Sequence, residues 1–391
     1  MSVFDPLVGQ QAVVEQLQAA AVAAQDLLSG GTGAGMTHAW LFTGPPGSGR
    51  SVAARAFAAA LQCEQQGCGH CDVCHLALMG NHTDVAVVRP EGLSLGVKEV
   101  RQIVEHSARA PVHGRWQVTI IEDADRMPDY ASNALLKAIE EPPPSGVIML
   151  CAPSVDDLLP TIRSRCRLVS LRTPAAADVA HVLVERDGVD PAMASFAARA
   201  AQGHIGRARR LAQDEQARAE RRDVLALPRS LGNIGQALAA AKDLVDAAKE
   251  EADRLTSTRD VEERAALSTA LGGGATGKGY TGTAPKGGAA DLKELEKKQK
   301  SRGTRTQRDA LDRALIDLAS FYRDVLTLQL HTGSVAVHAD LVEQASTIAS
   351  RTSAESTLRR LDAILGCRTA IEGNVAPLLA VEAMALALRS G

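Results

Sequence analysis

Aromatic residues are scarce in this sequence, which leaves aliphatic side chains and alanine to fill its cores. Phe, Trp and Tyr make up 3% of the 391 residues, whereas hydrophobic residues as a class make up 45%. Neither sign of charge is in excess, because 43 Lys and Arg stand against 46 Asp and Glu, a net charge of −3. That balance argues against a strongly basic protein that coats DNA, although it leaves a local basic face open.

Segments that direct a chain to a membrane are also lacking. Residues 1–10 contain no basic run followed by an apolar core, the arrangement of a signal peptide. No apolar stretch reaches the roughly 20 residues that a helix needs to cross a bilayer. We therefore expect a cytoplasmic protein with no membrane partner.

Short apolar runs separated by helical segments predict a parallel α/β sheet in residues 1–172. Runs this short and this apolar fit strands that are buried on both faces. Helical spacing appears between them, at 97–109 and 129–140, and three prolines at 142–144 stop the second helix. The expected fold is a sheet with helices on both faces. The expected strands are Trp40–Thr43, Asp84–Val88, Val118–Ile121, Val147–Cys151 and Leu168–Leu171.

The remaining residues predict helices. Thr173-Pro174 marks a boundary, after which we expect a small helical unit at 173–213 and an all-helical domain at 214–391. Eight glycines between 272 and 288 cannot build a core, so a flexible insertion is expected at about 255–308. The basic segment at 291–308 is interpreted as a solvated, partly helical arm rather than a DNA contact.

A glycine-rich loop follows the first expected strand and precedes a helix that begins at about Arg50. This context suits a phosphate cradle, because glycines let backbone N–H groups face phosphate oxygens; the alternative is a turn without a ligand. Ser51 stands where a hydroxyl ligates magnesium, but Arg50 replaces the usual lysine with a bulkier guanidinium. Binding of ATP and magnesium therefore stays open, and efficient hydrolysis is not expected. The candidate nucleotide-binding residues are Gly44, Pro45, Pro46, Gly47, Ser48, Gly49, Arg50 and Ser51.

Two acidic residues, Glu122 and Asp123, follow the strand expected at 118–121. Carboxylates at this end of a strand beside a P-loop hold magnesium and activate water in ATPases. An active ATPase of this kind has the order Asp-Glu, so each side chain here is one methylene too long or too short. An error of about 1.5 Å is severe where ~1 Å can cost ~100-fold in rate. Contact with magnesium stays open beside the alternative of a charged corner, and catalysis is not expected.

Four of the seven cysteines form a C-x4-C-x2-C-x2-C pattern at Cys63, Cys68, Cys71 and Cys74. Such interlocking steps can wrap a tetrahedral zinc ion, and glycines at 67 and 69 let the chain fold back. The alternative is a pair of disulfides, which the cytoplasm disfavours. Four thiolates leave no open coordination position, so the sequence predicts a structural zinc site.

Three arginines alternate in the turn Arg163-Ser164-Arg165-Cys166-Arg167, which precedes the last expected strand. Alternating charges of this kind are costly in a core, so the turn is expected at a surface or interface. The pattern alone favours a solvated face. The functional alternative is an arginine that reaches the nucleotide site of a neighbouring subunit.

These motifs, in this order, resemble the subunits of bacterial DNA polymerase III clamp loaders, which belong to the AAA+ family. The resemblance also includes Phe4–Gln10 and Asn133–Pro143, and it covers about residues 1–213. It implies an AAA+ α/β domain at 1–172, a helical lid at 173–213 and a helical collar for oligomerisation at 214–391.

Four departures favour the stationary type of subunit, with a decayed nucleotide site, over the ATP-hydrolysing motor called gamma or tau. They are Arg50, the order Glu122-Asp123, Pro153 after the fourth strand, and Gly206 where the motor carries a sensor arginine. The resemblance implies that Arg165 acts in trans on an adjacent motor subunit. It also implies a complex with motor and delta subunits that loads the sliding clamp onto primed DNA.

Two rival functions share parts of this pattern. The motor subunit itself is disfavoured by Arg50 and Gly206. A zinc scaffold that binds nucleic acid would need aromatic side chains or Lys and Arg around the cysteines, and residues 63–75 contain no Phe, Trp, Tyr, Lys or Arg.

Overall fold

The computed structural model describes residues 2–271 and 288–391 of the chain. The chain divides into two units, one made of residues 1–90 and 94–213 and the other of residues 91–93 and 214–391. The predicted division into an α/β domain, a lid and a collar stays a prediction. Among the described residues, no helix is both long enough and apolar enough to cross a membrane.

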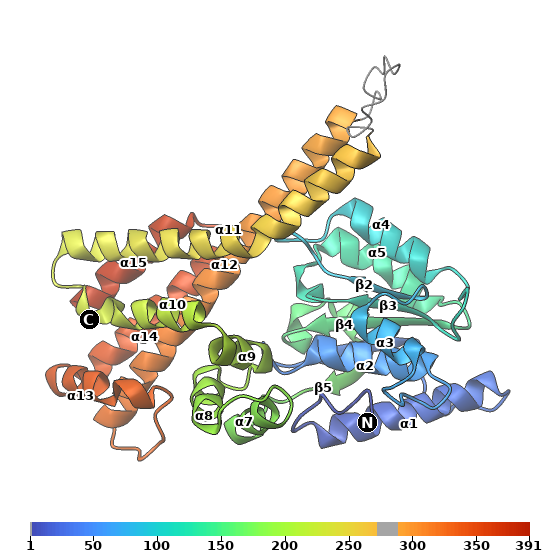
Figure 1. The fold of residues 1–391 in the computed structure, drawn as a ribbon, viewed down its shortest axis with the longest axis horizontal. Helices are drawn as coiled ribbons and strands as arrows, with labels where there is room; N and C mark the ends of the chain where they lie inside the picture. Colours follow the sequence, from blue (N-terminus) through green and yellow to red (C-terminus); the bar gives the residue numbers. More distant parts are fainter. Residues whose placement is uncertain (1, 272–287) are drawn as a thin grey trace. The chain divides into compact units, whose positions relative to one another are not determined.

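A five-stranded parallel sheet forms the centre of the first unit (Figure 1). Its order is β2-β3-β4-β1-β5, so β4 separates β1, which leads into the P-loop, from β3, which leads into the acidic pair. Residues of β1, β3 and β4 are buried throughout, as near-continuous apolar runs predict. The strands are β1 (Ala39–Thr43), β2 (Val85–Val88), β3 (Gln117–Ile121), β4 (Gly146–Ala152) and β5 (Arg167–Ser170).

Helices cover both faces of this sheet, which confirms the predicted α/β fold class of a parallel sheet between layers of helices. Trp40 and Phe42 of β1 share a core with α1 and α2, whereas Leu41 joins a second core with α4 and α5. This split follows from the alternation of side chains along a strand. The helices are α1 (Gln11–Leu28), α2 (Arg50–Gln62), α3 (Asp72–Met79), α4 (Val97–Ser107), α5 (Asp129–Glu140) and α6 (Pro160–Arg163), followed by α7 (Ala176–Glu185), α8 (Pro191–Ala200) and α9 (Ile205–Gln213).

The second unit is helical, with an aliphatic core around Phe321 and Tyr322. Its two longest helices, α11 and α12, lie side by side (Figure 1). The helices are α10 (Glu215–Ala226), α11 (Ile234–Ala270), α12 (Gly288–Gln329), α13 (Val342–Arg351), α14 (Ala354–Glu372) and α15 (Pro377–Ser390).

The range predicted for the flexible insertion, about 255–308, is too long, because helices α11 and α12 occupy most of it. The glycine-rich residues 272–287 lie outside the described residues. The basic arm at 291–308 is not fully solvated either, since Arg302 is 8% exposed and its guanidinium lies 2.8 Å from Asp260 of α11. A hydrogen bond from Arg302 lowers the pKa of Glu263 to about 2. Partners on the facing helix thus neutralise a basic side chain that composition alone assigns to solvent.

Candidate functional site

The P-loop, residues 44–51, joins β1 to α2 as the sequence predicts. Helix α2 begins at Arg50, and Gly49 before it has a left-handed φ of 94°. In residues 2–271 and 288–391, neither the N–H of Gly47 nor that of Gly49 has a hydrogen-bond partner. Together with the first N–H groups of α2, they form a surface that can donate hydrogen bonds to phosphate oxygens.

Three polar side-chain atoms near this loop are buried without a hydrogen-bond partner among the described residues. They are Oγ of Ser48, Nη1 of Arg50 and Oδ1 of Asp125. Burial raises the pKa of Asp125, with a further rise from Asp123, while the positive charge of Arg50 opposes it. Buried polar groups usually have partners, so unmet donors and acceptors beside free N–H groups fit a polar ligand such as a phosphate with its cation.

The acidic pair is engaged by arginines of the same chain. Glu122 is 6% exposed, and its Oε1 accepts from Nη2 and Nε of Arg55 at 2.9 and 3.2 Å. Asp123 has a left-handed φ of 51°, and its Oδ2 lies 4.0 Å from Nε of Arg89. A magnesium ion would have to compete with Arg55 for Glu122, so magnesium contact at this pair stays a prediction.

The helical segment 173–213 places His204 against the P-loop. A Cβ added at Gly47 would lie 2.4 Å from Cγ of His204, so only glycine allows the two residues to lie this close. The left-handed φ of +86° at Gly47 also favours glycine. Gly206, two residues after His204, is exposed and has no side chain. A group that enters the loop therefore meets an imidazole here, and no guanidinium from position 206.

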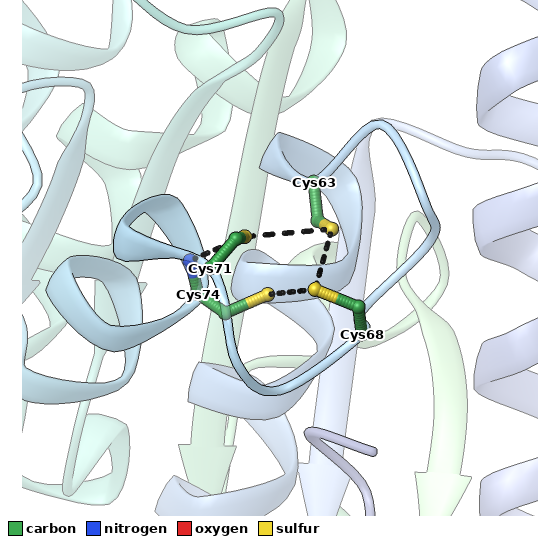
Figure 2. A group of neighbouring side chains, drawn as sticks. All are labelled: Cys63, Cys68, Cys71 and Cys74. Carbon is green, nitrogen blue, oxygen red and sulfur yellow. Dashed lines mark hydrogen bonds between the residues drawn. The ribbon is translucent and has the colours of Figure 1, made fainter. Parts of the chain in front are cut away.

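The four predicted cysteines converge on one point (Figure 2). Cys63 ends α2, Cys71 is the N-cap of α3, and Cys74 lies in its first turn. Their sulfur atoms all lie within 4.8 Å of one another, with separations of 3.7 Å for Cys63–Cys68, 3.9 Å for Cys63–Cys71 and 4.0 Å for Cys68–Cys74. Tetrahedral thiolates about 2.3 Å from a zinc ion have edges of about 3.8 Å.

The cysteine cluster could therefore hold a metal ion. A backbone hydrogen bond at His70 lowers the pKa of the Cys68 thiol to about 6, while burial raises that of Cys74. Coordination to a divalent cation would deprotonate both kinds of thiol. His70 and His75 are exposed and lie outside the cluster, in agreement with the four-sulfur ligand set.

Arg165 lies on the surface, and its guanidinium is held by its own chain. Nη2 lies 2.7 Å from Oε1 of Glu140 at the end of α5. Nη1 donates to the carbonyl oxygen of Thr161 at 2.9 Å and to Oγ of Ser164 at 3.3 Å. The neighbouring Arg163 pairs separately with Asp156 at 2.7 Å. All three arginines of the turn are exposed.

Arg165 and the P-loop lie at opposite ends of the sheet. The P-loop follows the carboxyl end of β1, and Arg165 precedes the amino end of β5 by two residues. These strands are parallel neighbours, with Trp40 beside Arg167 and Thr43 beside Ser170. The paired stretch alone is about 10 Å long at about 3.3 Å per residue. Arg165 thus lies far from the phosphate-type loop of its own chain.

Sequence reasoning did not assign roles to four side chains that meet these sites: Arg55, Asp125, Glu140 and His204. Each contact joins residues that are distant along the chain, so no local spacing points to it. The only available signals were that Glu140 lies within Asn133–Pro143, which carries part of the resemblance, and that Asp125 and His204 stand two residues from Asp123 and Gly206.

The parallel sheet, the strand–loop–helix P-loop and the helical segment after β5 define a P-loop α/β fold. Residues 21–175 match the family model described as "DNA polymerase III, delta subunit". The chain is 37% identical over 146 residues to DNA polymerase III subunit delta' of Pseudomonas aeruginosa, covering 36% of this chain and 44% of that protein. It is 32% identical over 166 residues to subunit delta' of Bacillus subtilis, covering 42% and 50%.

Proteins named gamma or tau subunits are similar as well. Subunit gamma/tau of Mycobacterium tuberculosis is 33% identical over 167 residues, covering 41% of this chain and 27% of that protein. A gamma subunit-related protein of Thermotoga maritima covers 90% of this chain and 94% of its own, at 17% identity and a TM-score of 0.40. The matches span about half the length of the delta' relatives. The predicted resemblance to DNA polymerase III subunits is thereby confirmed for the N-terminal part of the chain.

Proposed function

We propose that this chain is the delta-prime subunit of a clamp loader, which helps to load the sliding clamp onto primed DNA during replication. It would work in a pentamer with gamma/tau motor subunits and a delta subunit, with residues 214–391 as the collar. The observation that carries this proposal is the exposed Arg165, set at the opposite end of the sheet from a P-loop whose basic residue is Arg50. The location that follows is the cytoplasm, at the nucleoid through the replication machinery.

The position of Arg165 supports a role in trans. A guanidinium on the surface, remote from its own phosphate-type loop, can stabilise phosphoryl charge only on another molecule. In related phosphoryl transfers such an arginine compensates the charge on the transferring group. The adjacent motor subunit of a ring-like assembly supplies that group in this proposal.

The chain's own nucleotide site fits binding better than hydrolysis. ATP supplies phosphates that Gly47, Gly49 and Arg50 would hold, with Ser51 as the candidate magnesium ligand. Asp123 would have to orient the attacking water, but its side chain is shorter than that of the usual glutamate. Glu122 cannot replace it easily, because its carboxylate is paired with Arg55. The four cysteines would hold a structural zinc ion, the metal that prefers four thiolates in a closed tetrahedron.

We expect the isolated chain to release no phosphate from ATP above background. Arg50→Lys should not create activity, because the Arg55–Glu122 pair remains and position 206 still lacks a side chain. The measurement is steady-state phosphate release by the wild type, Arg50→Lys and Ser51→Ala. Steady release by the wild type that Ser51→Ala abolishes would identify a motor subunit instead.

Assembly tests the proposal directly. Purified chain is mixed with gamma/tau and delta subunits, and the complex is assayed for loading of the clamp onto primed DNA. We expect a stable complex that loads the clamp only when this chain is present. A chain that fails to join the complex, or whose omission leaves loading unchanged, would contradict the delta-prime role.

A further inference from the structure

We propose that Glu140 restrains Arg165 on its own subunit, so that the guanidinium engages a neighbour's nucleotide only when this pair breaks. The proposal rests on the function proposed above and adds a regulatory residue to it. We call the contact between Glu140 and Arg165 the arginine restraint. Glu140 acts through Arg165 and is therefore a positioning residue.

The geometry of the restraint occupies both terminal nitrogens of the guanidinium. Nη2 faces Oε1 of Glu140 at 2.7 Å, and Nη1 faces the Thr161 carbonyl oxygen at 2.9 Å. An arginine grips a phosphoryl group by presenting two N–H donors as a fork. While these contacts last, one N–H of Nη2 and the Nε–H are the donors left over, so the fork across the two terminal nitrogens opens fully toward another molecule only when the contacts break.

The core anchors the helix end that carries Glu140, whereas the ion pair itself is open to water. Glu140 is the last residue of α5, and the preceding Ile139 is buried in the core beside Leu135, which sets the direction of the helix end. The side chains of Arg165 and Glu140 are 42% and 45% exposed. A pair this open to water is weak and screened by salt, so a phosphoryl group with more charge can displace the carboxylate.

The restraint also lowers the positive field that a nucleotide would meet. With Glu140 ionised, the pair carries no net charge, and only its separation from the carboxylate exposes the full charge of Arg165. Loss of the carboxylate should therefore free the donors and strengthen the attraction for an anionic nucleotide at once. Both effects act in the same direction, toward easier engagement of the neighbour.

The decisive variant is Glu140→Gln in the complete complex with wild-type motor subunits. We expect ATP hydrolysis without clamp and DNA to rise about twofold to fivefold, the range that an exposed ion pair can shift an equilibrium. The KM for ATP should fall, whereas maximal stimulated turnover should stay close to wild type. High salt should erase the difference, because screening weakens the pair in the wild type.

Two controls isolate the pair. Asp156→Asn removes the carboxylate that pairs with Arg163 in the same turn and should leave hydrolysis unchanged. In an Arg165→Ala background, Glu140→Gln should have no further effect, because the residue that it restrains is gone. An effect of Glu140→Gln that persists without Arg165 would overturn the restraint.

A measurement on the isolated chain tests the contact without the complex. The rate at which phenylglyoxal, an arginine-specific dicarbonyl, modifies Arg165 should increase in Glu140→Gln, as followed by mass spectrometry. An equal rate in both proteins would overturn the restraint whatever the function of the chain. In the complex, Glu140→Gln activity that equals wild type, or falls as in Arg165→Ala, would also overturn it. If Arg165→Ala itself leaves turnover unchanged, the trans role fails, and the restraint fails with it.

Discussion

Replacing Arg165 with alanine should leave this chain folded and able to assemble, yet sharply lower ATP hydrolysis by the adjacent motor subunit. The side chain is exposed, and its contacts with Glu140 and Thr161 are surface contacts that contribute little to stability. Loss of an arginine finger costs about 10³-fold or more in related phosphoryl transfers. The loss for the whole complex should be smaller, because a clamp loader has several nucleotide sites.

The measurement is clamp- and DNA-stimulated ATP turnover of a complex that contains wild-type motor subunits, with assembly followed in parallel. Arg165→Lys should not restore activity, since a lysine lacks the fork that spans two phosphate oxygens. Arg163→Ala is the matched control, because Arg163 is an exposed arginine of the same turn with its own carboxylate partner. If Arg165→Ala changes neither assembly nor turnover, Arg165 is only a surface charge.

The sheet and the two candidate sites were accessible from the sequence because local signals define them. Short apolar segments indicate the buried strands. Helix α5 spans Asp129–Glu140, as its periodicity and the prolines after it predict. The cysteines were predictable for a similar reason. Their spacing is short, so one turn and the start of one helix are enough to bring the sulfur atoms together.

Contacts between distant segments were not accessible in this way. The sequence left contact between Glu122 and magnesium open, and nothing in it showed that Arg55 reaches this carboxylate across 67 residues of sequence. His204 meets Gly47 only because the helical segment folds over the loop. The prediction for the residues that flank the insertion was wrong for a different reason. Composition assigned Arg302 to solvent, whereas facing carboxylates on α11 allow it to be buried in helix packing.

Loss of one cysteine ligand should remove the metal and destabilise the first unit. We expect one zinc ion per chain in the wild type and none in Cys68→Ser or Cys71→Ser, because three thiolates no longer close the tetrahedron. A bound ion would organise more than its own loop, because Cys71 caps α3 and the N–H of Val3 donates to the carbonyl oxygen of Gly67 at 3.1 Å. The N-terminal segment should therefore loosen along with α3.

The size of this effect follows from how the cluster is supported. Structural zinc contributes about 10–16 kcal/mol to small peptides that depend on it entirely. Here Cys74 and Ala77 also pack into the core of the sheet domain, so the cost should be smaller, several kcal/mol, or about 5–15 °C in Tm. Metal analysis and calorimetry measure the two outcomes. His75→Ala and Cys367→Ala should keep the zinc, since one side chain is exposed outside the cluster and the other lies in the second unit. Freshly reduced wild type without zinc, or Cys68→Ser that retains a full equivalent, would show that the four thiols pack together without a metal.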